Sequence, residues 1–212
     1  AVILSRYFDK AEYGTYKQIL YVYNTLLIVF SAGLPKVFSY YLPRYEFSKG
    51  KDIVYRVTAL LFVAGLVFSV FLYVFSDLIA LILRNQELST GLKIFSPIPA
   101  LLLPTLGLEG IFASYGKAKN IAIYNTLSRI LMLVFIVSPV LFFQGSYIEA
   151  TYGWIVSSVF CLLVALIMLK NNFKGVKTEK SGLEIKTIFA YSLPLVGASL
   201  AGIAIKSSAQ FF

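Results

Sequence analysis

Three charged side chains stand within apolar sequence, where a charge is costly. Glu109 lies in LEGIFASY, Arg129 in NTLSRILML and Lys206 in AGIAIKSS. At membrane depth each charge costs about 2.5 to 3.5 kcal/mol on insertion scales, so it usually faces an opposite charge or a water-filled cavity. These three residues are therefore the first candidates for a substrate or ion site.

Glu109 and Arg129 fall on either side of a short polar turn around Gly116. If that turn joins two antiparallel helices, the depths of the two side chains differ by about 5 Å, from the helical rise per residue. An ion pair between them is therefore feasible. Two interpretations stay open: a pair that only fixes the packing of the two helices, and a pair that takes part in substrate or ion binding. Lys206 has no acidic neighbour in its own segment, so it is free to meet an anion or a distant carboxylate.

Further polar residues in apolar surroundings are weaker candidates. Asn24 and Asn125 carry amides, which in membranes more often form hydrogen bonds between helices than bind ligands. Arg6 lies at the outer end of a first helix, where extension of the side chain to the lipid headgroups is the default explanation. The full set of candidate cavity residues is Arg129, Lys206, Glu109, Asn24, Asn125 and Arg6.

Composition excludes several kinds of chemistry. The chain is 58% apolar and only 14% charged, and its apolar residues come in long runs, which indicates a polytopic membrane protein. Histidine is absent and Cys161 is the only cysteine. Disulfides, structural zinc and histidine-based acid–base catalysis are therefore excluded, and we expect no cofactor. A coupling ion, H⁺ or Na⁺, stays open.

Uncharged runs predict an all-α fold, a polytopic transmembrane helix bundle. The run 94–108 reaches spanning length only if Glu109 lies in the membrane and the helix continues to Tyr115, and the run 130–148 needs residues 120–128 added before it. Gln144-Gly145-Ser146 predicts a tight turn between two of the helices. The chain opens on AVILSRYF without an initiator Met, so we interpret it as a piece of a longer protein with the end of a first helix, five complete helices and most of a seventh. The runs are 18–35, 57–76, 94–108, 130–148, 150–169 and 187–205.

The stretch from Asp9 to Glu46 enters and leaves the membrane within one segment. Asp9 followed by Glu12 is a capping-box pattern, which predicts a helix that starts near Lys10. Gly33-Leu34-Pro35 then predicts a break, because Gly weakens a helix and Pro removes a backbone donor. Such a break survives at membrane depth only where protein or water satisfies the freed backbone groups. We therefore expect this side of the helix to face a cavity or neighbouring helices.

Loop charge predicts the orientation. Twelve Lys and Arg residues fall in the second, fourth and sixth connections and their flanks, against five on the opposite side, so the positive-inside rule places the even connections in the cytoplasm. Lys36 is counted among the flanks of the first of these connections. The polar stretch NNFKGVKTEKSGLEIK, residues 171–186, is the natural boundary between two bundles, and we interpret it as a solvated cytoplasmic loop rather than a regulatory element.

Several stretches are similar to one protein family. SRYFDKAEYGTYKQ, an apolar helix and then GLPKVFSYYLPRYE resembles the start of the polysaccharide biosynthesis (oligosaccharide flippase) proteins: an Arg near the end of helix 1, a short turn, Glu-Tyr-Gly, and a second helix with a Gly-Leu-Pro break. LEGIFASYGKAKNIAIYNTLSRI is similar to the family's fourth helix, turn and fifth helix, and YSLPLVGASLAGIAIKSSAQFF to the opening of its seventh. The resemblance covers all 212 residues.

The resemblance implies the multidrug/oligosaccharidyl-lipid/polysaccharide exporter fold, in which two six-helix lobes enclose a central cavity used for alternating access. Residues 1–170 would form the N-terminal lobe, 171–186 a cytoplasmic linker and 187–212 helix 7, the start of the C-terminal lobe. The implied function is not enzymatic: it is the flipping of a lipid-linked oligosaccharide across the cytoplasmic membrane for cell-surface polysaccharide synthesis. The implied partners are membrane lipids, the lipid-linked glycan and polysaccharide-assembly membrane proteins.

The residues agree with this function and also define its rivals. A pyrophosphate-linked glycan needs a cationic cavity, and Arg129 and Lys206 supply positive charge at membrane depth. An ion-coupled multidrug/cation antiporter would favour a cavity lined by carboxylates. A membrane-embedded glycosyltransferase or polymerase would need paired carboxylates or a metal motif, and this sequence has no such cluster. Nucleic acid is not expected as a partner, because the basic loops are short and their aromatic residues are placed at membrane interfaces.

Overall fold

Helices are the only regular elements in the part of the chain that the computed structural model describes, residues 7–143 and 146–208, of which Phe143 and residues 200–208 are described by their backbone alone. This confirms the predicted all-α class. In chain order the elements are α1 (Lys10–Phe30), α2 (Pro35–Tyr41), a 3₁₀ turn (Leu42–Arg44), α3 (Phe47–Ile82), α4 (Glu87–Phe95), α5 (Ile98–Leu102), a second 3₁₀ turn (Leu103–Gly107), α6 (Leu108–Ser114), α7 (Ala118–Phe143), α8 (Tyr147–Asn172) and α9 (Ile185–Ser208).

Four helical segments in the described residues are long and apolar enough to cross a membrane, and α1 with α2 makes a fifth if that bent pair counts as one span. The chain is thus a multi-pass membrane protein. The segment Glu87–Ser114 continues past Glu109, as predicted. It is built from α4, α5 and α6 instead of one continuous helix, because Pro97, Pro99 and Pro104 each remove a backbone donor within it.

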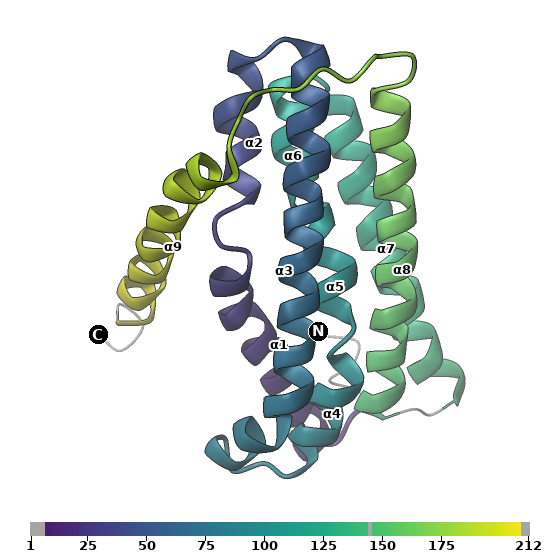
Figure 1. The fold of residues 1–212 in the computed structure, drawn as a ribbon. Coiled ribbons are helices and arrows are strands. Elements are labelled where there is room, and N and C mark those ends of the chain that lie inside the picture. The colour runs from purple at the N-terminus through teal and green to yellow at the C-terminus, as the bar shows by residue number, and fades with distance from the viewer. Residues whose placement is uncertain (1–6, 144–145, 209–212) are drawn as a thin grey trace.

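Successive spans alternate in direction (Figure 1). The α2–α3 connection, the α6–α7 turn and the connection from α8 to α9 lie together at the top of Figure 1, which we call the linker end. The α3–α4 connection and the start of α1 lie at the opposite end. The predicted capping box is present at that start, where Asp9 Oδ1 accepts from the Glu12 amide at 2.7 Å. The turn predicted at 144–146 falls largely on residues 144–145, outside the described residues.

Helix α3 runs the full height of the bundle in Figure 1. Its 36 residues make a helix about 54 Å long, whereas a hydrocarbon core is about 30 Å thick. Both ends therefore extend into the headgroup layers, and its charged residues, such as Arg56 near the linker end and Asp77 near the other, lie toward those ends. Between them, Val63, Val67 and Val70 are more than half exposed, an apolar surface suited to contact with lipid.

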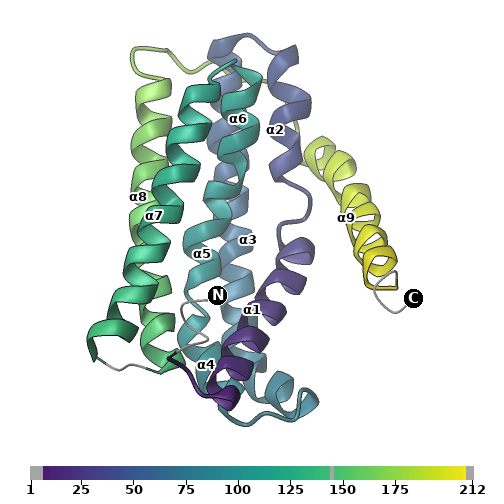
Figure 2. The same ribbon diagram turned by 180° about the vertical axis from the view of Figure 1, so that it is seen from behind.

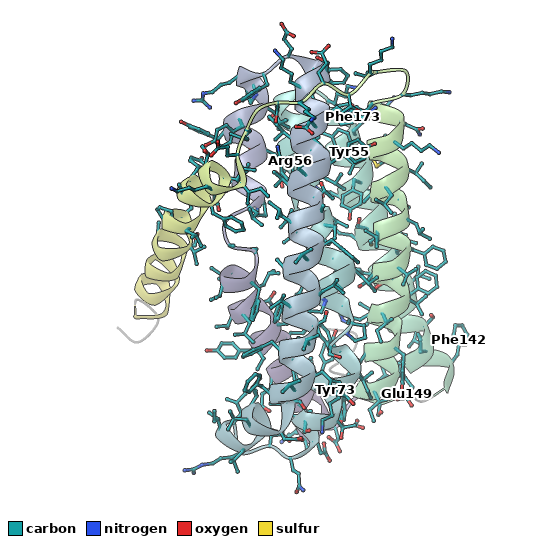
Figure 3. The ribbon with its side chains drawn as sticks, in the orientation of Figure 1. Tyr55, Arg56, Tyr73, Phe142, Glu149 and Phe173 are labelled. Atoms are coloured by element: carbon teal, nitrogen blue, oxygen red, sulfur yellow. The ribbon has the colours of Figure 1, made fainter. Side chains whose placement is uncertain are left out.

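Side-chain contacts fasten both ends of the bundle, polar at one end and aromatic at the other. At the opposite end, Asn85 Nδ2 donates to Thr15 Oγ1 at 2.9 Å and to Gln18 Oε1 at 2.6 Å, which ties α1 to the α3–α4 connection. At the linker end, Phe173 stacks on Phe47 with ring centroids 5.0 Å apart. Figure 3 shows Phe173 beside Tyr55 and Arg56 at that end, with Tyr73, Glu149 and Phe142 near the other. Apolar packing occupies the length between, in two buried clusters.

Helices α8 and α9 differ in how closely they pack against the bundle. Helices α7 and α8 lie side by side along their length, and at Gly153 their backbones approach so closely that an added Cβ would be 2.0 Å from Phe135 O. Helix α9, by contrast, leans away from the bundle toward its C-terminal end and contacts it at α1 and α2 (Figures 1 and 2).

The predicted linker is shorter in the structure. Helix α8 runs to Asn172 and α9 begins at Ile185, so Asn171, Asn172 and Lys186 belong to helices. The connection is also not a loop surrounded only by solvent, because several of its residues are hydrogen-bonded to α3, as described below.

The orientation stays a prediction that labelling tests directly. In a Cys161→Ala background, single cysteines in place of the exposed Lys119 and Lys177 lie at the linker end, and one in place of the exposed Gln86 lies at the other. We expect a membrane-impermeant maleimide to reach position 86 in intact cells and positions 119 and 177 only after lysis, because of the loop-charge asymmetry. Labelling of position 177 in intact cells would reverse the orientation.

Candidate functional site

The helical segment formed by α1 and α2, which we call the first span, is broken where the sequence predicts. Helix α1 ends at Phe30, α2 begins at Pro35, and the two are bent by 41°. Ala32 and Gly33 both have left-handed backbone conformations, with φ of 48° and 66°. Glycine adopts this conformation freely, but at Ala32 it costs roughly 1 kcal/mol. The break is thus held in place by its surroundings, and the first of these is α9.

Helix α9 packs directly on the break. A Cβ built on Gly33 would lie 2.4 Å from Ser192 O, so no side chain fits between the two backbones. Ser192 is fully buried, and within the described part of the chain its Oγ has no hydrogen-bond partner. A buried polar group left without a partner costs about 1 to 3 kcal/mol. The contact between α9 and the break is therefore close, yet it contains an unfavourable group.

Three tyrosines, which we call the tyrosine clasp, join α9 to α2 next to this contact. Tyr191 stacks on Tyr40 with ring centroids 4.2 Å apart and meets the edge of Tyr41 at 5.6 Å. The Arg44 guanidinium carbon lies 3.8 Å from the Tyr40 ring centroid, and Arg44 also donates to the Tyr40 carbonyl. Aromatic and cation–π contacts of this kind hold surfaces together without requiring hydrogen bonds between them.

A small cavity of about 140 Å³ lies beside the break, between the first span and α9. Ser31 Oγ donates to Ile28 O at 3.2 Å, and Ser199 Oγ donates to Leu195 O at 2.8 Å. Both hydroxyl oxygens can still accept hydrogen bonds from other groups. Lys36 is exposed and adds a positive charge. Among the described residues that line the cavity none is acidic, so its chemistry suits an anionic group. The lining residues are Ile28, Ser31, Gly33, Pro35, Lys36, Val196 and Ser199.

Lys36 lies farther from the linker end than its count among the flanking loop charges suggests. It was counted with the loop charges, but the chain resumes a helix at Pro35 and Lys36 lies on the first turn of α2. Five residues of α-helix and a three-residue 3₁₀ turn separate it from the linker end, a depth of about 14 Å. Pro35 itself carries the missed signal, because proline is favoured at the first position of a helix and so marks a restart as well as a break.

The other polar candidates in the described residues are all exposed, but no contact brings them together. Asn24 lies on α1, Glu109 on α6, and Asn125 and Arg129 one turn apart on α7. Helices α6 and α7 lie toward the viewer in Figure 2, in front of α3. Arg129 is eleven residues from the start of α7, about 16 Å deep and close to the depth of Lys36. Arg6 lies outside the described residues, as does the side chain of Lys206 on α9.

Glu109 and Arg129 do not form the ion pair that the sequence made feasible. The ion pairs among described residues are Arg56–Asp52 at 3.7 Å and Lys93–Asp77 at 2.9 Å, near the two ends of α3. Helix α6 ends at Ser114 and α7 begins at Ala118, so Glu109 is five residues from the turn and Arg129 eleven. Their depths then differ by about 9 Å, nearly twice the predicted offset. Each charge is exposed instead.

The described residues contain no candidate metal site and no disulfide. No group of three or more Cys, Asp or Glu side chains is arranged there to hold a metal ion. Cys161 is buried and unpaired by any disulfide. The arrangement offers cations, hydroxyls and amides at several depths, which can bind and guide a polar or anionic group.

Comparison with known families gives one match. The family model described as "Polysaccharide biosynthesis protein" matches residues 1–212, the whole of the sequence. The chain belongs to this family. No curated protein and no solved structure matches it. This match confirms the family resemblance that the three sequence stretches carry.

The separation of Glu109 and Arg129 is testable by a double-mutant cycle. We expect the losses in melting temperature of Glu109→Ala and Arg129→Ala in the full-length protein to add in the double variant, because the two side chains are not in contact. The matched control is Asp77→Ala with Lys93→Ala, whose contact at 2.9 Å should make the losses non-additive. A double variant no less stable than either single variant at 109 and 129 would show that the charges meet.

Proposed function

We propose that this protein moves a lipid-linked oligosaccharide, a glycan carried on polyprenyl pyrophosphate, across the cytoplasmic membrane by alternating access, and that it is a transporter and not an enzyme. Family membership supports a role in polysaccharide biosynthesis. The observation that carries the finer proposal is the cationic cavity of Lys36, between the broken first span and α9. On this proposal residues 1–170 form one lobe, 171–186 the linker, and 187–212 open a second lobe.

The chemistry of the substrate fits this arrangement. A pyrophosphate carries several negative charges, which Lys binds as a point charge and Arg by paired hydrogen bonds. Lys36 lies about 14 Å from the linker end, near the level where the uncharged run 57–76 of α3 begins. A headgroup in the cytoplasmic leaflet would therefore meet Lys36 first, while the polyprenyl chain stays in lipid.

Further exposed polar residues outside the Lys36 cavity complete the proposal. Arg129 supplies a second exposed cation at a similar depth, and Asn24 lies deeper, on the other side of the break from Lys36. Hydroxyl-rich sugars pair readily with amide and hydroxyl groups of this kind. Glu109 and Asn125, and from the sequence Lys206 and Arg6, stay in the proposal as further cavity residues.

The main rival is an ion-coupled export of cationic drugs. A cationic substrate would favour carboxylates in the cavity, yet the described lining residues beside the break include Lys36 and no carboxylate. The charge of the cavity therefore supports an anionic substrate.

The test replaces the cavity cations in the full-length protein. We expect Lys36→Gln and Arg129→Gln each to lower surface polysaccharide about tenfold or more in a flippase-deficient strain, since a hydrogen bond to a charged group contributes about 1.5 to 3 kcal/mol. Lys36→Arg and Arg129→Lys should retain part of the activity, and the lipid-linked intermediate should accumulate on the cytoplasmic leaflet. Lys119→Gln, an exposed cation at the start of α7, is the matched control and should be silent.

Two results would contradict the proposal. Full complementation by both Gln variants, with normal membrane insertion, would remove the cationic cavity from the mechanism. Failure of the unmodified protein to complement, together with export of cationic drugs, would replace the flippase by the antiporter.

A further inference from the structure

The connection from α8 to α9 is anchored to the linker end of α3. Asp52 Oδ2 accepts from the Ser181 amide at 3.0 Å and from Ser181 Oγ at 2.7 Å. Arg56 donates to Leu183 O at 2.8 Å, and Lys51 Nζ donates to Val176 O at 2.7 Å. We call this connection, residues 173–184, the strap. It is a fixed attachment and not a loose tether.

The strap determines where α9 can turn. Leu183 is buried, and α9 begins two residues later at Ile185. Gly182, directly before Leu183, has a φ of 71°, a conformation that other residues rarely adopt. The first turn of α9 is therefore held at the linker end, and a movement of α9 relative to the bundle must be a swing about residues 182–184.

The contact between α9 and the first span is of a different kind. Among the described residues no hydrogen bond joins α9 to α2, and the tyrosine clasp makes the contact through ring faces and edges. Next to it, Ser192 buries a hydroxyl without a described partner. Separation of the two helices would return that hydroxyl to water or lipid headgroups, so opening recovers part of the interaction energy that is lost with the aromatic contacts.

From this contrast we propose that the tyrosine clasp is the closure at the linker end of the passage, that it opens by a swing of α9 about the anchored strap, and that the unpartnered Ser192 hydroxyl keeps the closed state weak enough to reopen. This inference rests on the proposed function and names the contact that regulates access to the Lys36 cavity. A transporter must populate both states, and a contact that is too stable would trap one of them.

The proposal makes Tyr191 and Ser192, adjacent positions, act in opposite directions. Tyr191→Ala removes the clasp and should populate the open state. Ser192→Ala removes the buried hydroxyl and should favour the closed state about fivefold or more, from the cost of an unpartnered group. Tyr191→Phe is the matched control, because it keeps the stacked ring, and it should preserve the balance of the unmodified protein.

The measurement uses two spin labels on the full-length protein in nanodiscs of phosphatidylglycerol and phosphatidylethanolamine, in a Cys161→Ala background. Labels at Glu46, on the linker end, and Ala198, on α9, are exposed and outside the clasp. Double electron–electron resonance should show a distance distribution with two populations. We expect Tyr191→Ala and Ser192→Ala to move the populations in opposite directions, and both to lower surface polysaccharide.

The outcomes separate this proposal from the function on which it rests. Unchanged distributions in both variants, or a shift of both in the same direction, would overturn the closure. Opposite shifts in a protein that never supplies surface polysaccharide would support the closure and contradict the flippase function. A Tyr191→Phe variant that behaves as Tyr191→Ala would overturn the role of ring stacking.

Discussion

In a bilayer, a break in a helix survives only where its freed backbone groups find partners. At this break the amides of Ser31, Ala32 and Leu34 donate to carbonyls of the same segment, so α9 acts on the break by packing. The left-handed conformation of Ala32 is unfavourable in isolation, and the backbone of α9 at Ser192 lies against the neighbouring Gly33. Because only glycine admits this approach, the position of α9 and the shape of the break are linked. The Lys36 cavity and the tyrosine clasp both lie beside this contact, so the proposed closure and the proposed binding of substrate involve the same part of the structure.

The remainder of the bundle holds that contact between two fastened ends. Asn85 ties α1 to the α3–α4 connection, while Asp52 and Arg56 anchor the strap at the linker end. Between the ends the packing is apolar, with close backbone contacts such as that of Gly153 on α7. In this division α3, α7 and α8 form the support, whereas among the described residues α9 meets α2 through aromatic contacts and no hydrogen bond. Movement is then expected where attachment is weakest.

The features that depend on local chemistry could be predicted from the sequence. Asp9 and Glu12 predicted a helix start, Gly33-Leu34-Pro35 a break, and the uncharged runs the spans, because each signal acts within a few residues. The predictions were wrong or missing where a position or contact depends on how distant segments pack together. The difference in depth between Glu109 and Arg129 depends on where α6 ends and α7 begins. The position of Lys36 depends on the restart of a helix at Pro35. The hydrogen bond of Ser181 to Asp52 joins two segments far apart in sequence. The tyrosine clasp could not be predicted from the sequence for the same reason, since Tyr40 and Tyr191 meet only in the folded chain.

The central claim is that α9 packs on the broken first span and that the cavity between them receives the anionic headgroup. Its most direct test is an electron cryomicroscopy map of the full-length protein in lipid nanodiscs with a lipid-linked oligosaccharide bound. The account predicts a break at residues 31–34, Ser192 against Gly33 in one class of particles, and pyrophosphate density beside Lys36. A continuous helix through residues 10–44, or headgroup density remote from Lys36 in every class, would contradict it.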